Sequence, residues 1–319
     1  MASFGKIDAF ALQTGALARV VTEALRVKDN FTFSGVIPWI DLGTEQVYHK
    51  EAVSSYGSTD PAAAASSADI TYSNVIPAKT SVYLMNTVVG AQMPIQFMND
   101  PKQMATQLSK KAYKLADVLA TRLASTGAAT DTNFAGMGSL SDSVNTQTLS
   151  GGTLNGSTSG AITVDQVRQL IQTVHGAQDD GKAIVMRPGT YVAFVKAIEA
   201  LSWSLQVADV AGVRVPLVDG VTPIFINGYI GKGNDCGAAA QLTTRVYCAA
   251  LNEDLGFAGI FGSGGPALDQ NLNAWSGAVR YRLVDDSDST QVNLQLWAYV
   301  NFVLQESTSF AQIVGITDL

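Results

Sequence analysis

The stretch Gly176-Ala-Gln-Asp-Asp-Gly181-Lys182-Ala183 has the spacing of a phosphate-binding loop, in which backbone amides and a lysine hold a nucleotide. Such a loop carries a serine or threonine after the lysine to bind magnesium, whereas this chain has Ala183 there. The flanking pattern also predicts a helix before the stretch and a strand after it. A phosphate-binding loop needs the reverse order, so that the following helix points its amino end at the phosphate. We therefore interpret the stretch as a polar turn.

A second glycine-rich stretch, Gly231-Lys-Gly233-Asn-Asp-Cys236-Gly237, approaches the dinucleotide-binding fingerprint. Its third glycine falls one residue late, and no helix pattern starts there. The stretch is interpreted as a loop.

Histidine and cysteine are scarce, which limits metal and nucleophile chemistry. The chain has only His49, His175, Cys236 and Cys248, and neither histidine has a cysteine or carboxylate at metal-ligand spacing. Two cysteines cannot build a disulfide framework or a four-thiolate zinc site. Cys248 lies in an apolar run and is predicted to be a core residue. A His–Cys nucleophilic pair formed by the fold stays open, although nothing local supports one.

The acidic residues Asp285, Asp286 and Asp288 suggest a calcium loop at first sight. They lack the loop glycine and the bidentate glutamate that a calcium-binding hand uses, and hairpin turns favour aspartate anyway. We predict a turn there, no metal and no cofactor.

The charge content points to partners. Only 15% of the 319 residues are charged, against about 25% in an average soluble chain, and the net charge is −7. At 47% hydrophobic residues the chain must fold, yet it has few charges to cover its exterior, so much of that exterior is expected to be buried against other copies or partners. The negative balance argues against a general nucleic-acid binder. Neither a secretory signal nor a membrane span is evident, which predicts a reducing, aqueous compartment.

Residues 31 to 98 read as extended strands, with a loop tip at about residues 55 to 66. The segments 46–51 and 68–73 on either side predict a long two-stranded hairpin. An isolated ribbon is marginal in water, so this one is expected either to fold back on its own domain or to reach a neighbouring subunit. The candidates for inter-subunit contact are Tyr48, His49, Lys50, Tyr56 and Tyr72.

A long amphipathic helix is predicted over about 101–125, capped by Asp100 with Pro101 in its first turn. Its polar side carries a basic stripe. We expect this stripe to be either an ordinary solvated face or an inward-facing surface for a polyanion such as packaged nucleic acid. Its members are Lys102, Lys110, Lys111 and Lys114, with Arg122 nearby.

The rest of the chain predicts a mixed α/β region followed by strands. Residues 139–160 read as a flexible connector, and a capping box at Thr163 to Gln166 opens a helix. In the predicted C-terminal strand 294–304, Trp297 and Tyr299 lie on the face opposite the alternating apolar residues. Both faces of this strand are therefore expected to be covered. The predicted ranges are 163–178 and 188–201 for helices, and 183–186, 213–218, 222–226, 244–251, 256–261, 278–283 and 294–304 for strands.

This order of parts resembles the major capsid proteins of tailed double-stranded DNA bacteriophages, the Hong Kong 97-like fold. Local motifs that are similar to the family's lie at residues 131–137, 187–191, 215–217, 223–227 and 297–316. The first reads Asp-Thr-Asn-Phe-Ala-Gly-Met, and the second reads Arg-Pro-Gly-Thr-Tyr and starts a helix. The resemblance covers nearly the whole chain in order.

The resemblance implies an α+β fold with an N-terminal arm (1–35), a long β-hairpin extended loop (36–85) and an axial domain (140–269). A discontinuous peripheral domain (86–139 and 270–319) would hold the long spine helix. It implies no enzymatic activity and no cofactor. The chain would self-assemble in the bacterial host cytoplasm into hexamers and pentamers of an icosahedral virion head that matures around double-stranded DNA.

Further partners follow from the same resemblance. Some relatives carry a cleaved scaffolding segment, but the hairpin here starts by about residue 36. A separate scaffolding protein is therefore expected, together with a portal and a decoration or cement protein. A crosslink through Lys50 or Lys79 has no supporting motif. Two rivals stay open. One is an encapsulin, a bacterial compartment shell of the same fold, and the other is an α/β small-molecule enzyme with His175 or His49 near a cleft.

Overall fold

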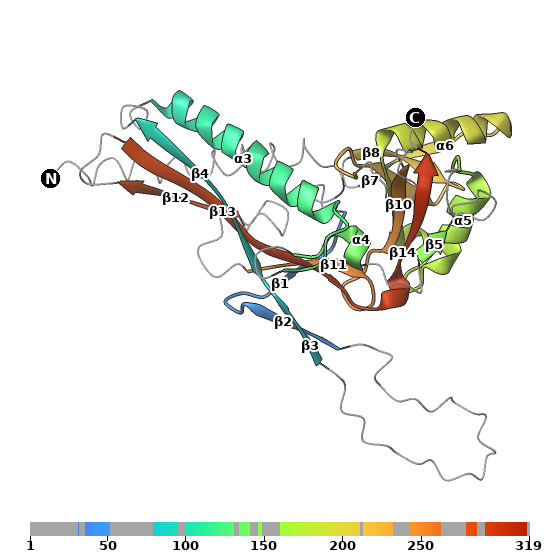
Figure 1. The fold of residues 1–319 in the computed structure, drawn as a ribbon, viewed down its shortest axis with the longest axis horizontal. Helices are drawn as coiled ribbons and strands as arrows, with labels where there is room; N and C mark the ends of the chain where they lie inside the picture. Colours follow the sequence, from blue (N-terminus) through green and yellow to red (C-terminus); the bar gives the residue numbers. More distant parts are fainter. Residues whose placement is uncertain are drawn as a thin grey trace, which may run out of the picture.

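The computed structural model describes residues 31, 36–51, 79–94, 100–130, 134–140, 146–148, 160–210, 213–231, 243–262, 279–285 and 291–317. The chain forms an elongated body with a long sheet and one long helix at one end and a compact helix-covered sheet at the other (Figure 1). A two-stranded ribbon leaves the body near its middle (Figure 1). Among the described residues, no helix combines the length and the apolar character that a membrane span requires.

The long sheet is built around β13 (Gln291–Leu304), the strand with the clearest alternation in the sequence. Its first part pairs antiparallel with β4 (Met85–Pro94) on one side and with β12 (Val279–Asp285) on the other. Its last part pairs with β11 (Phe257–Phe261), which in turn pairs in parallel with β1 (Trp39–Asp41). Gly259 lets the two strands come together, because a Cβ atom there would lie 2.4 Å from the Trp39 ring.

Helix α3 (Pro101–Leu123) crosses one face of this sheet (Figure 1). Asp100 caps it as predicted, since its carboxylate accepts hydrogen bonds from the amides of Lys102 and Gln103. The apolar stripe, which includes Leu115, Leu119 and Leu123, is buried against β13 side chains of even number. The burial of Leu296, Ala298, Val300, Phe302 and Leu304 confirms the period-two pattern.

The second sheet has seven strands in the order β5-β14-β10-β6-β9-β8-β7. Its strands are β5 (Thr146–Thr148), β6 (Lys182–Met186), β7 (Gln206–Val210), β8 (Val213–Val218), β9 (Thr222–Ile226), β10 (Thr243–Ala250) and β14 (Phe310–Thr317). Helices α5 (Val164–Thr173) and α6 (Pro188–Ala200) pack on one face. The capping box predicted at Thr163 is present, with the Thr163 hydroxyl and the Gln166 side chain each bonded to the other residue's amide.

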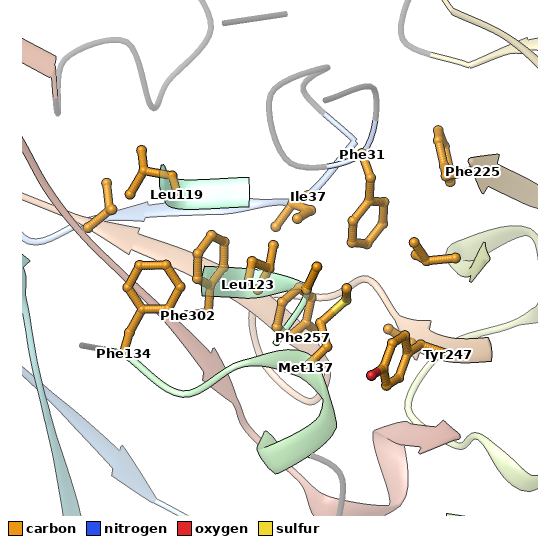
Figure 2. Close-up of a cluster of buried hydrophobic side chains, with 14 of the residues drawn as sticks. Phe31, Ile37, Leu119, Leu123, Phe134, Met137, Phe225, Tyr247, Phe257 and Phe302 are labelled. Carbon is orange, nitrogen blue, oxygen red and sulfur yellow. The ribbon is translucent and has the colours of Figure 1, made fainter. Parts of the chain in front are cut away.

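One hydrophobic core joins the two sheets. Alternate residues of β6 and β10 face opposite ways, so Ile184 and Cys248 contact the helices while Val185 and Tyr247 face the long sheet. Figure 2 shows aromatic side chains from both sheets meeting in this core. Phe257 stacks on Phe302 at 5.7 Å and lies 5.8 Å from Phe310 of the second sheet, measured between ring centroids. Because these contacts cross between the sheets, the two parts form one continuous core.

A polar link adds to this junction. The Tyr229 hydroxyl, in the loop after β9, donates a hydrogen bond to the Asp117 carboxylate on α3. Arg187 Nη1 donates to the Ile230 carbonyl at 2.6 Å in the same loop. The loop therefore fixes the long helix to the seven-stranded sheet.

The ribbon differs from the predicted hairpin in its pairing. Strand β2 (Val47–Glu51) forms where expected, but its partner is β3 (Lys79–Tyr83), not residues 68–73. The predicted segment 68–73 lies outside the described residues. The 79–83 partner brings Val82 into an apolar cluster with Tyr48 and Leu84 at the base of the ribbon, and this burial selects the register. Residues 39–41, within the range 36–85 expected for the extended loop, instead form β1 of the long sheet.

Three further expectations need correction. Residues 139–160 are not a structureless connector, because α4 (Met137–Leu140) and β5 lie in or next to that range and β5 pairs with β14. The helix predicted to reach residue 178 ends at Thr173, where the buried Lys182 donates a hydrogen bond to the Ile171 carbonyl in the last turn. Strand β7 was not anticipated, and none of its five residues is buried. The apolar spacing at residues 8–27 also predicts a helix, and that range lies outside the described residues.

Cys248 gives a first prediction. The side chain is fully buried, and burial raises the pKa of its thiol to about 12. In a Cys236→Ser variant, which leaves a single thiol, we expect the folded protein at pH 8 to react with an aromatic disulfide reagent at least about a thousandfold more slowly than free cysteine. Unfolding in urea should restore the normal rate. A fast reaction in the absence of urea would contradict the core placement.

Candidate assembly surfaces

In the stretch 176–183, which has the spacing of a phosphate-binding loop, the lysine makes structural contacts within the chain. Lys182 is buried, and its Nζ donates to the Ile171 carbonyl at 2.9 Å and to Asp179 Oδ1 at 2.8 Å. Helix α5 precedes the stretch and β6 follows it. The lysine therefore closes the carboxyl end of α5, and the interpretation as a polar turn is confirmed.

The histidines and cysteines do not gather into a surface site in the part of the chain that the structure describes. His49 is exposed on β2, with Nδ1 3.4 Å from Ser81 Oγ, and His175 is exposed after α5. Cys248 lies in the core, while Cys236 is outside the described residues. Among these same residues no three His, Cys, Asp or Glu side chains gather as metal ligands. Asp285 ends β12, and Asp286 and Asp288 are outside the described residues.

The ribbon is anchored at its base and exposed beyond it. The Tyr48 hydroxyl accepts a 2.7 Å hydrogen bond from Gln305 Nε2, and its ring packs with Ile40 and Val82. Tyr48 therefore has an intramolecular role that the sequence did not suggest. His49 is exposed, and the neighbouring Tyr83 side chain is 58% exposed. Lys50 lies in β2, whereas Tyr56 and Tyr72 are outside the described residues. Inter-subunit contact by the candidates stays a prediction.

The basic stripe lies on the side of α3 away from the core. Lys102, Lys110 and Lys114 are exposed and Lys111 is half-buried. The structure brings Lys110 and Lys114 onto one helical face, four residues apart. Arg122 is engaged elsewhere, because its Nη1 donates to Thr87 Oγ1 on β4 at 2.8 Å. Four lysines therefore stay available for contact with a polyanion, and whether they face inward stays a prediction.

The face of the long sheet opposite α3 is partly open. Val88 is 53% exposed and pairs in register with Trp297, while Tyr299 pairs with Asn86 and both aromatic residues are half-buried. We expected both faces of β13 to be covered, and in the described residues α3 covers one of them. An apolar side chain as exposed as Val88 in mid-strand indicates a surface that can be covered by another chain.

A hollow that sequence reasoning missed lies at the end of the second sheet, among α5, α6, β7, β8 and the turn that follows β8. Its volume is about 240 Å³, and its walls include Phe194, Ile198 and the half-exposed Trp203. The Arg168 guanidinium stacks on the Trp203 ring at 4.8 Å and binds Asp219 in a bidentate pair of 2.6 and 2.8 Å. Neither histidine lines it, contrary to the enzyme alternative. The sequence signal that could have pointed to this hollow is Trp203, which lies between two serines just after the helix predicted over 188–201.

The ion pair of this hollow predicts a weak acid dependence. The hydrogen bonds from Arg168 lower the pKa of Asp219, so the stabilisation is present at neutral pH and is lost as the pH falls below about 4. Because both side chains are substantially exposed, the melting temperature of an Asp219→Asn variant should lie only about 1–2 °C below that of the wild type at pH 6. The difference should vanish near pH 2 in thermal melts. A difference that grows in acid would contradict the assignment.

Comparison with known proteins identifies the fold. No protein-family model and no curated protein sequence matches the chain. The chain is similar to a chain of the holo-SrpI encapsulin complex from Synechococcus elongatus, with a TM-score of 0.63, 12% identity, and coverage of 88% of this chain and 85% of that one. It is similar to the capsid of a native GTA particle, with a TM-score of 0.58, 11% identity and 88% coverage of each chain.

A third similar structure is the capsid of Ralstonia phage GP4, with a TM-score of 0.54, 10% identity, and coverage of 91% of this chain and 89% of that one. Identities this low establish shape and nothing finer. The chain therefore has the α+β Hong Kong 97-like capsid fold, which confirms the fold class predicted from its sequence.

Proposed function

We propose that this chain is the major capsid protein of a tailed double-stranded DNA bacteriophage, a structural protein without enzymatic activity. Copies would self-assemble into the hexamers and pentamers of an icosahedral head. The proposal is carried by the combination of the capsid fold with a ribbon whose described residues rest on their own body only at the base.

The ribbon supports assembly energetically. Two strands without a third partner bury too little surface to be stable alone, so a ribbon of this kind gains most from packing on another surface. The Tyr48–Gln305 hydrogen bond and the apolar cluster of Val82 and Leu84 fix its direction. A fixed direction reduces the conformational entropy lost when the ribbon docks on a neighbour.

The open surfaces support it as well. Val88 on the long sheet and Tyr83 on the ribbon are large, exposed and uncharged. In a symmetric shell each such contact repeats in every subunit, so modest individual affinities suffice for a stable particle. The low charge content of the chain agrees with an exterior that is largely covered.

In this proposal the domains are those expected from the sequence, with three corrections. Residues 39–41 and 257–261 belong to the long sheet, and residues 310–317 belong to the seven-stranded sheet. A separate scaffolding protein would guide assembly, and a portal and a decoration protein would join the virion. The four lysines of α3 would face inward and contact the packaged DNA without sequence preference. Head expansion on packaging would re-angle the ribbon and α3 as rigid parts.

A bacterial encapsulin is the second candidate, favoured by the similarity to the encapsulin of Synechococcus elongatus. The two functions differ in contents, since a phage head holds DNA and an encapsulin holds a cargo protein. Nuclease-protected DNA in particles purified from the native source supports the phage head. A co-purifying enzyme inside the particles supports the encapsulin.

Electron microscopy and sedimentation velocity of the purified chain test the shell function itself. We expect closed particles at high protein concentration, or with the scaffolding protein present. A folded chain that stays monomeric over the whole concentration range, with and without that scaffold, would refute both shell functions.

A further inference from the structure

The hollow beside Trp203 lies within a single subunit. Its walls come from α5, α6, β7, β8 and the turn that follows β8, and its volume is about 240 Å³. Sites for drug-sized ligands usually have volumes of about 300–1,000 Å³. A ligand of this hollow is therefore small, with room for one apolar group and a compact polar head.

The lining of the hollow separates into a buried apolar part and an exposed polar part. The lining residues that are buried are all apolar, and they are Val164, Phe194, Ile198 and Val218. The side chains of the lining that carry a charge, a hydroxyl or an amide all reach solvent, and they are Arg168, Ser204, Gln206 and Asp219. A ligand that enters with its apolar group first and keeps its polar head at the opening matches both parts.

One ion pair supplies both charges of the opening. Arg168 Nε donates to Asp219 Oδ2 at 2.8 Å, and Arg168 Nη2 donates to Asp219 Oδ1 at 2.6 Å. In the part of the chain that the structure describes, Arg168 Nη1 makes no hydrogen bond. A carboxylate has about four acceptor positions, and these two bonds use half of them. The opening therefore offers a cationic donor beside anionic acceptor positions.

The ion pair is held in place before any ligand arrives. The guanidinium carbon of Arg168 lies 4.8 Å from the centre of the Trp203 ring, so Trp203 and Asp219 together restrict the rotation of this group. Asp219 has a φ of 50° in the turn after β8, and Gly220 follows it with a φ of 75°. Aspartate and glycine both suit such a left-handed turn. A charged pair that is already ordered loses little conformational entropy when a ligand binds.

The paired charges indicate which ligand fits. An amine alone would bind Asp219 but would also meet the like charge of Arg168, and a carboxylic acid alone would meet the charge of Asp219 in the same way. A molecule with an ammonium group and a carboxylate on one carbon atom matches both partners. A lysine side chain of another protein does not fit, because its charge is at the far end and would enter the apolar part first.

We propose that this hollow binds a free α-amino acid with an aliphatic side chain of about the size of leucine. The side chain lies against Phe194, Ile198 and Val218, the ammonium group binds the open acceptor positions of Asp219, and the carboxylate binds Arg168 Nη1. The inference goes beyond the proposed shell function and does not depend on it, because every group involved belongs to one subunit.

Calorimetric titration of the unassembled full chain with L-leucine and three matched compounds tests this inference. 3-Methylbutylamine lacks the carboxylate of leucine, 4-methylpentanoate lacks the ammonium group, and glycine lacks the side chain. At pH 7 we expect one L-leucine to bind per chain with a Kd of about 1 mM or lower, and each matched compound to bind at least about tenfold more weakly. Binding of the amine or of the acid as tightly as leucine would overturn the assignment.

Two aspartate variants place the ligand in the hollow. Asp219→Asn removes the anionic partner at little cost in stability, so leucine should bind it at least about tenfold more weakly than the wild type. Asp209→Asn makes the same change on β7 outside the lining and should bind leucine normally. If leucine does not saturate the wild-type chain, or if Asp219→Asn binds it as the wild type does, the inference is wrong while the shell function stands. Particle formation is not part of this readout, so failure of the shell function would leave the result unchanged.

Discussion

Replacing residues 52–78 with an Asn-Gly turn should leave a folded chain that forms no particles. Glu51 and Lys79 are register partners at the end of the paired ribbon, so a two-residue turn can join them without disturbing β2 and β3. The contacts of Tyr48 with Gln305 and of Val82 with its cluster are kept, so the melting temperature should stay within a few degrees of the wild-type value. Assembly should be lost because the shortened ribbon no longer reaches a neighbour.

Light scattering and electron microscopy measure this result, and a Tyr48→Phe variant serves as the control. Losing the hydroxyl should cost about 0.5–1.5 kcal/mol of stability while leaving the ribbon at full length, so this variant should still assemble. Particles of normal size from the shortened chain would show that assembly does not use the ribbon beyond its base.

Phe302→Ala should lower the free energy of unfolding by about 3–5 kcal/mol, the usual cost of removing a buried aromatic side chain. The Phe302 ring centroid lies 5.2 Å from Phe134, 5.5 Å from Trp39 and 5.7 Å from Phe257. These neighbours come from the segment after α3, from β1 and from β11 (Figure 2 shows the two phenylalanines). Because the side chain packs against three elements, the cavity left behind cannot close easily.

Urea unfolding of the unassembled subunit measures this loss, and we expect the transition midpoint to fall while the dependence of the unfolding free energy on urea stays the same. Val88→Ala, on the open face of the same sheet, is the control and should change stability by less than about 0.5 kcal/mol. A loss below about 1 kcal/mol for Phe302→Ala would show that the aromatic cluster does not hold the long sheet together.

Local chemistry predicted the elements that it controls by itself. Asp100 and Thr163 cap helices because each side chain bonds an amide two or three residues away, and both caps are where the sequence predicted them. The alternation along β13 predicted its buried face for the same reason, since strand geometry alone sets that pattern. The paired strands Val213–Val218 and Thr222–Ile226 were also predicted correctly, because a short turn joins them.

The errors occur where the partner lies far along the chain. Strand β2 was predicted to pair with residues 68–73, but its register with Lys79–Tyr83 depends on burying Val82 against β11 and β13 residues more than 170 positions away. Strand β5 is held by β14, also more than 160 residues away. Neither pairing leaves a periodic signal in a three- to five-residue segment.

The candidate surfaces divide in the same way. The basic stripe on α3 followed from helical spacing, whereas the hollow beside Trp203 needs Arg168, Trp203 and Asp219 from three separate elements. The amino-acid sequence by itself determined the helix caps, the faces of the long strands and the scarcity of charge. Only the tertiary structure decided which distant strands pair and which apolar residues stay uncovered, because burial depends on the whole packed chain and not on any residue's neighbours in sequence.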